Sequence, residues 1–139
     1  MVTNFEDITK PLTDEENKYI ELLITGFQNR TKDNPIKAPD LIKNINSFVT
    51  THRPDIKKKL SEPRLRKLCN YIRTNSLIPL IATSKGYYVS YDKEEIQDQM
   101  QSLMDRAQAI IKSSYGLLKF LPVSTIEQLN LNHGNQHTQ

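Results

Sequence analysis

The chain has 139 residues, 19 basic and 16 acidic side chains, a formal net charge of +3 and a single cysteine. A chain of this length can bury one hydrophobic core without crosslinks, and a single cysteine excludes an internal disulfide framework. No apolar run approaches the roughly 18 residues needed to span a membrane, and the N-terminal residues do not resemble a signal peptide. These features predict one cytoplasmic domain with no membrane partner and no cofactor.

Two amphipathic helices are predicted in the first half of the chain. Residues 1–11 are expected to form a flexible lead-in, as chain termini often do. Thr13 and Glu16 match a capping box, which predicts that a helix begins there. A second helix is expected from Pro39 to about Thr50. The apolar face of the first helix holds Ile20, Leu23, Ile24 and Phe27. The apolar face of the second holds Leu41, Ile42, Ile45, Phe48 and Val49.

A third helix, predicted from Glu62 to Thr74, carries the side chains that suggest a partner. Ser61 can cap its N-terminus. Its apolar stripe is formed by Leu65, Leu68, Cys69 and Ile72, and its opposite face carries Arg66, Lys67, Asn70, Tyr71 and Thr74. An outer face of Arg, Lys and Asn suits a recognition helix in the major groove of DNA, where these side chains bind base edges and phosphates. The alternative is that this charged face only contacts solvent, as most such faces do.

Two short strands joined by a tight turn are predicted directly after this helix. Leu77–Thr83 and Tyr87–Tyr91 are rich in β-branched and aromatic residues, and Gly86 between them can adopt a positive φ. A hairpin in this position matches the wing of a winged helix-turn-helix, over residues 83–87, with Lys85 at its tip beside the DNA backbone. An ordinary solvent-exposed hairpin tip is the alternative.

Basic residues are concentrated just before and within the third predicted helix. Between Arg53 and Arg73 there are eight basic and two acidic residues, a local excess of +6 that is larger than the net charge of the chain. Such a cluster is typical of a surface that binds a polyanion. The predicted DNA contacts are Lys57, Lys58, Lys59, Arg64, Arg66, Lys67, Asn70, Tyr71, Arg73, Thr74 and Lys85.

The run IRTNSLIPLIATSKGYYVSYDKEEIQDQ resembles a group of small, mostly phage-encoded winged-helix proteins. The matching positions are Ile72, Arg73, Pro79, Leu80, Lys85, Gly86, Tyr87, Tyr88, Glu94 and Glu95. The likeness covers roughly Pro39 to Leu118, and its specific part is the wing. Leu80 departs from the Ile expected of the group, and the segment before the third helix is longer and more basic. The resemblance implies a DNA-binding protein that acts as a transcription regulator or a replication accessory factor.

A long C-terminal helix is predicted over residues 92–121, opened by the capping pattern of Asp92 and Glu95. Its apolar or small residues alternate at spacings of four and three, which is a heptad pattern and predicts a homodimer. The predicted dimerisation residues are Leu103, Ala107, Ile110, Ser114, Leu117 and Leu121. Met104, Ile111 and Leu118 widen the stripe beyond a simple two-stranded seam. The alternative is a helix that folds back along its own domain.

The polar segment 122–139 is predicted to be a disordered tail. His133 and His137 lie four residues apart but have no third ligand in this segment, so no metal site is expected.

The sequence contains no Gly-rich phosphate loop and no GxSxG, HExxH or CxxC motif, so no enzymatic activity is expected. The predicted fold is mainly α with a small β-hairpin, a winged helix-turn-helix over residues 12–91 followed by the long helix. Two functions remain open. One is double-stranded DNA binding in transcription regulation or replication; the other is a non-enzymatic interaction module whose helix 92–121 binds or inhibits a partner protein.

Overall fold

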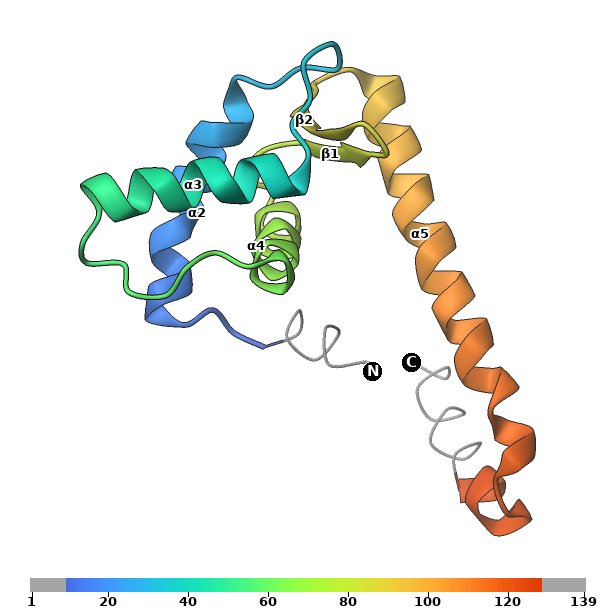
Figure 1. Cartoon of the computed structure of the whole chain (residues 1–139). Helices are drawn as coiled ribbons and strands as arrows, with labels where there is room; N and C mark the ends of the chain where they lie inside the picture. The colour runs from blue at the N-terminus through green and yellow to red at the C-terminus, as the bar shows by residue number, and fades with distance from the viewer. Residues whose placement is uncertain (1–9, 129–139) are drawn as a thin grey trace. The chain divides into compact units, whose positions relative to one another are not determined.

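The structure is a computed structural model of the chain, and it describes residues 10–128. The elements in chain order are α2 (Asp14–Gln28), α3 (Ala38–His52), α4 (Glu62–Thr74), β1 (Leu80–Thr83), β2 (Gly86–Val89), α5 (Lys93–Gly116) and η1 (Leu118–Phe120) (Figure 1). This confirms the prediction of a mainly helical fold with a small β-hairpin. Most of the predicted lead-in and the tail from residue 129, with His133 and His137, lie outside the described residues.

The chain forms two compact units, an N-terminal unit of residues 1–99 and a C-terminal unit of residues 100–139. The N-terminal unit holds the three-helix core and the hairpin, and the C-terminal unit holds the distal part of α5 together with η1. Residues 123–128, which fall in the segment predicted to be disordered, are helical. Within residues 10–128, no helix has the length and apolar content that crossing a membrane requires.

Local sequence signals account for the starts of the core helices. The capping box is complete at α2, where the Thr13 hydroxyl accepts from the Glu16 amide at 3.2 Å and the Glu16 carboxylate accepts from the Thr13 amide at 2.9 Å. Ser61 caps α4 by accepting from the Arg64 amide at 3.4 Å. The bounds of α4 are those predicted from its apolar stripe and cap.

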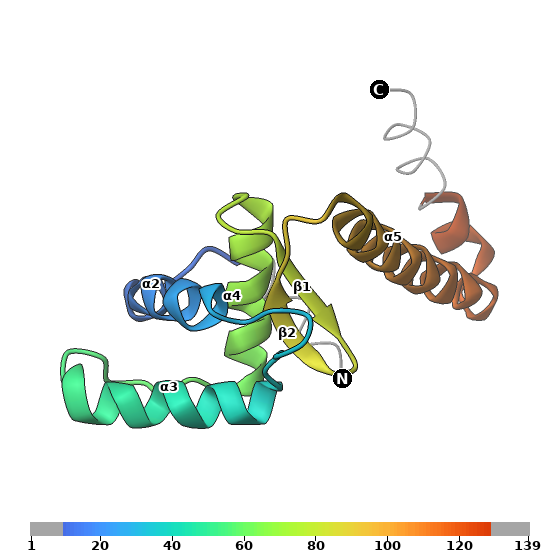
Figure 2. The same ribbon diagram turned by 90° about the horizontal axis from the view of Figure 1, so that it is seen from above.

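The hydrophobic core lies where α2, α3 and α4 meet beneath the hairpin (Figures 1 and 2). Its largest fully buried side chains are Tyr19, Phe27, Leu23, Leu41, Leu65, Leu68, Ile72 and Cys69. Tyr19 was not among the predicted core residues, whereas Phe48, which was, is 44% exposed and stacks on the His52 ring at 4.6 Å. The buried row of α3 is therefore narrower than predicted and follows Leu41, Ile45 and Val49 at spacings of four.

The hairpin pairs antiparallel with the register Leu80↔Val89 to Thr83↔Gly86. A residue from between α2 and α3 extends it, because the Ile36 and Tyr87 backbones exchange hydrogen bonds of 2.9 and 2.7 Å across the free edge of β2. The first strand begins at Leu80 rather than at Leu77. The intervening segment instead ends α4: Ser76 adopts a positive φ of 53°, and the Leu77 amide donates to the Ile72 carbonyl at 3.0 Å.

The long helix differs from its prediction at the C-terminal end. The Asp92 carboxylate accepts from the Glu95 amide at 3.1 Å and so caps the start of α5 as predicted. The helix ends at Gly116, however, and the chain continues as a tight turn and the short helix η1. Glycine is a poor helix former, so α5 ends there, although the apolar spacing predicts a helix as far as residue 121. Leu117 and Leu121, two predicted dimerisation residues, therefore lie outside α5.

Gly86 at the hairpin turn is required by both its backbone and its surroundings. Its φ is 130°, and a Cβ placed there would lie 2.6 Å from the carbonyl carbon and oxygen of Ile36. Since both neighbouring atoms belong to the backbone of a paired residue, neither can move without breaking the Ile36–Tyr87 bridge.

We expect Gly86→Ala to destabilise the N-terminal unit by about 1–3 kcal/mol, the cost of a strained backbone made worse by the close contact. Thermal unfolding followed by circular dichroism measures this as a lower Tm. Gly116→Ala is the matched control, because nothing lies within 4 Å of a Cβ at that position. Its Tm should be unchanged or slightly higher, and equal effects of the two substitutions would contradict the assigned contact.

Candidate nucleic-acid interface

One row of side chains along α4 is accessible from solvent. Arg66, Asn70 and Thr74 recur every four residues, and each is exposed. The Arg66 side chain is 42% exposed, and its guanidinium lies 3.7 Å from the Glu62 carboxylate one turn earlier. An exposed ion pair of this kind is weak, so the guanidinium remains available to another acceptor. Arg66 and Asn70 therefore present hydrogen-bonding groups that match base edges, and Thr74 presents a hydroxyl.

Lys67 does not belong to this row, and its predicted place on the outer face was wrong. The residue is 7% exposed, and its ammonium donates to the Glu16 carboxylate at 2.7 Å and to the Pro11 carbonyl at 3.1 Å. The chain entering α2 runs across this side of α4 and covers the lysine. Lys67 therefore joins two segments of the fold and is not available to bind DNA.

Arg64 and Arg73 are also held by the fold. Arg64 donates to the Lys59 carbonyl at 2.8 Å and lies 3.4 Å from the Glu16 carboxylate, with its side chain 25% exposed. Arg73 is half-buried and donates through Nε to the Leu80 carbonyl at 3.1 Å, which joins α4 to β1. These two predicted DNA contacts thus act mainly as crosslinks between segments of the N-terminal unit.

The segment before α4 combines a fixed backbone with exposed cations. Lys57, Lys58 and Lys59 are all exposed, and within the described part of the chain no acidic side chain forms an ion pair with them. Their backbone is anchored to α2, since the Lys57 amide donates to the Glu15 carboxylate at 2.9 Å and the Tyr19 hydroxyl donates to the Lys58 carbonyl. The three ammonium groups therefore extend from a well-held segment.

The end of the same segment is joined to α3. The Asn46 side chain exchanges two hydrogen bonds with the backbone of Leu60, donating at 3.0 Å and accepting at 2.8 Å. Beside this junction is an open hollow of about 420 Å³. Its lining consists of Lys43, Asn46, Ser47, Thr50, Thr51 and Lys59. The lining contains no acidic side chain, and Lys43 adds a cation beside the lysine segment. Lys43 was not among the predicted contacts. The polar residues of α3, which recur at spacings of four and three, could have indicated that it lies on an exposed face.

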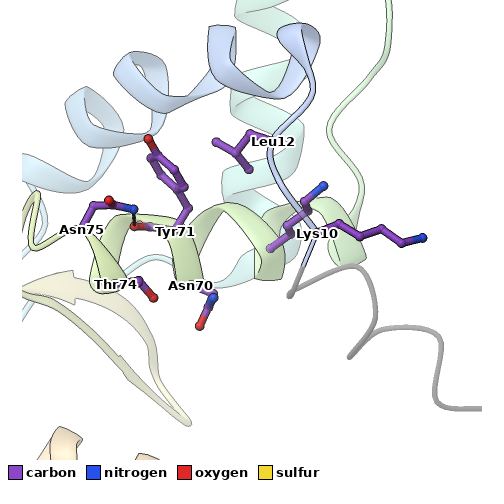
Figure 3. Close-up of a pocket in the computed structure, with 7 residues that line it drawn as sticks. Lys10, Leu12, Asn70, Tyr71, Thr74 and Asn75 are labelled. Carbon is purple, nitrogen blue, oxygen red and sulfur yellow. Dashed lines mark hydrogen bonds between the residues drawn. The ribbon is translucent and has the colours of Figure 1, made fainter.

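A smaller pocket of about 150 Å³ adjoins the outer face of α4 (Figure 3). It is lined by Lys10, Leu12, Lys67, Asn70, Tyr71, Thr74 and Asn75. Tyr71 is half-buried, and its carbonyl accepts from the Asn75 side chain at 2.9 Å. The pocket brings together Asn70, Tyr71 and Thr74 of the predicted contacts and places residues of the N-terminal segment beside them.

Two further predicted features lie apart from α4's outer face. Lys85 is exposed at the turn between β1 and β2, where its amide donates to the Thr83 hydroxyl at 3.2 Å. Cys69 is buried in the core, and this burial raises the pKa of its thiol to about 11. The thiol is therefore protonated at neutral pH and unsuited to act as a nucleophile.

Comparisons with protein-family models, with curated proteins and with solved structures found no match for this chain.

Residues 10–128 contain no group of three or more His, Cys, Asp or Glu side chains that could hold a metal ion.

The carboxylate of Glu16 makes the fold sensitive to acid. Burial raises its pKa, but the hydrogen bonds from Lys67 and Thr13, with the charge of Lys67, outweigh burial and hold the pKa below the usual 4.5. A carboxyl group whose pKa is lowered on folding stabilises the folded state at pH values above its pKa in the unfolded chain. This stabilisation is lost as the pH falls through its pKa in the folded chain.

We therefore expect the free energy of unfolding to fall as the pH is lowered below about 4.5. Glu16→Gln should be less stable than the native chain at pH 7, and the difference should shrink toward low pH. Urea unfolding at a series of pH values measures both effects. Glu21→Gln, at an exposed position of α2, is the control, and its free energy of unfolding should depend on pH as that of the native chain does. If Glu16→Gln also gave the pH dependence of the native chain, the stabilising role of Glu16 would be contradicted.

Proposed function

We propose that the chain is a winged-helix protein that binds double-stranded DNA, as a transcription regulator or a replication accessory factor. The observation that carries the proposal is the row of Arg66, Asn70 and Thr74, exposed along a helix that is followed at once by a hairpin. The pairing of Ile36 with β2 gives further support, because it adds a third short segment to the hairpin, as expected of a wing sheet.

Specificity in this proposal comes from α4 lying in the major groove. Arg66 suits the two acceptors of a guanine, and Asn70 suits the donor and acceptor of an adenine. Affinity comes from the lysine segment, Lys57, Lys58 and Lys59, and from Lys85 at the hairpin turn, which contact phosphates. Lys67, Arg64 and Arg73 are assigned to the support of α4 rather than to the DNA.

Fluorescence anisotropy of a labelled duplex, measured across a salt series, tests the phosphate contacts. We expect affinity to fall steeply with salt, and Lys58→Ala combined with Lys59→Ala to make the slope of log affinity against log salt shallower by about 0.9 per lost contact. Lys112→Ala, an exposed cation of α5, removes charge without touching the proposed surface and should leave the slope unchanged. No binding at the lowest salt would overturn the proposal.

The base contacts are tested separately once a preferred site has been selected from random duplexes. Arg66→Ala and Asn70→Ala should each cost about 1–3 kcal/mol at the selected site and relax its preference at one base pair. Their affinity for a random duplex should change much less, because phosphate contacts dominate there. An equal loss on both duplexes would place these side chains on the backbone and exclude them from base recognition.

A second function is favoured by a different observation. The distal part of α5 carries exposed apolar side chains, as expected of a surface that binds a protein. The alternative proposal is an interaction module that uses this helix to bind or inhibit another protein. Substitution of Ile110 by a polar residue would then abolish partner binding and leave any DNA affinity intact.

A further inference from the structure

The distal part of α5 has an unusually apolar surface for an exposed helix. None of the residues of α5 is buried, and the side chains of Met104 and Ile111 are 56% and 52% exposed. The large apolar side chains in this part of the helix that are at least one third exposed are Met100, Leu103, Met104, Ile110, Ile111 and Tyr115. Contiguous apolar surface of this kind marks a contact with another macromolecule.

The stripe has three rows when the helix is described in heptads. The a row holds Met100, Ala107 and Ser114, the d row holds Leu103 and Ile110, and the e row holds Met104 and Ile111. In a parallel pair of helices, each e residue faces the g residue of the partner. The g residues here are polar: Gln99, Arg106 and Ser113. When one helix is reversed, the e rows face each other, so an antiparallel pair buries Met104 and Ile111 together.

The sizes of the a and d residues favour the same orientation. In a parallel pair, Ala107 would face Ala107 and Ser114 would face Ser114, which leaves two thin layers in the interface. In an antiparallel pair, a residues face d residues, so that Ala107 faces Ile110 of the partner copy and Ser114 faces Leu103. Small side chains opposite large ones fill the layers evenly.

The charges of α5 are segregated along its length. From Glu94 to Asp105 the sequence has four acidic and no basic side chains, and from Arg106 to Gly116 it has two basic and no acidic ones. Parallel pairing would place the acidic halves side by side. Antiparallel pairing instead places the acidic segments of the two copies, each with Glu94, Glu95 and Asp98, at opposite ends of the pair, so the like charges are kept apart.

We propose that α5 pairs antiparallel with α5 of a second copy of the chain, with Leu103 opposite Ser114 and Ala107 opposite Ile110 in both directions. Row composition and side-chain size favour this arrangement, and it also separates the acidic segments of the two copies. The pairing extends the dimer predicted from the heptad pattern by fixing its direction and its register. It does not depend on DNA binding, so it is tested without DNA.

Disulfide trapping distinguishes the two orientations. Chains carrying Leu103→Cys and chains carrying Ser114→Cys, one of them with a mass tag, are mixed and exposed to oxidised glutathione. Because Cys69 is buried and its thiol has a raised pKa of about 11, it should not compete. We expect the mixed disulfide between the two different chains to exceed either disulfide between like chains at least tenfold. Asp105→Cys, on the polar face, is the control and should not form a disulfide.

The possible outcomes separate the proposal from its alternatives. Like-chain disulfides of Leu103→Cys would show a parallel pair and overturn the proposal. Sedimentation of the native chain is the second measurement: a dimer that becomes a monomer in Ile110→Asp supports the pairing. A native chain that stays monomeric throughout a concentration series would overturn it, and would leave the stripe to a different protein. DNA affinity measured on the same samples reports on the proposed function separately.

Discussion

The carboxylate of Glu16 is the point on which the arrangement of the N-terminal unit depends. It closes the capping box of α2, accepts from the buried ammonium of Lys67 and lies within ion-pair distance of Arg64. A buried charge is tolerated only where it is paired and hydrogen-bonded, and this one has three partners. The orientation of α4 against the start of α2 follows from this cluster, and so does the side of α4 that remains outside.

Because of this cluster, the segment has fewer basic side chains on its surface than its sequence contains. The sequence between Arg53 and Arg73 has an excess of +6, yet part of that charge neutralises Glu16 or holds backbone carbonyls inside the unit. The lysine segment before α4 and Arg66 on the helix remain on the surface. The backbone of the lysine segment is held by hydrogen bonds to side chains of α2 and α3. A rigid array of this kind loses less entropy on binding a polyanion than a flexible one would.

Features set by neighbouring residues were predictable from the sequence. The caps at Thr13 and Ser61 and the bounds of α4 depend on contacts within a few residues, and the turn at Gly86 was indicated by the residue type itself. The burial of Lys67 was not predictable, because its partner Glu16 lies 51 residues away and already had a local role as a cap. The late start of β1 was missed for a related reason: an apolar Leu77 suggested a strand, while its amide completes the end of α4.

The edges of the small sheet have a consequence for how this unit can be recognised. β2 is paired on both sides, by β1 and by Ile36. On the outer side of β1, the Ala82 amide donates to the Gln99 side chain at 2.8 Å. An unpaired strand edge is a template for strand addition by another chain, and here the carboxamide occupies a donor that an added strand would need. Edge-to-edge aggregation and β-augmentation are therefore disfavoured, so recognition of this unit depends on side chains of its helices and turns.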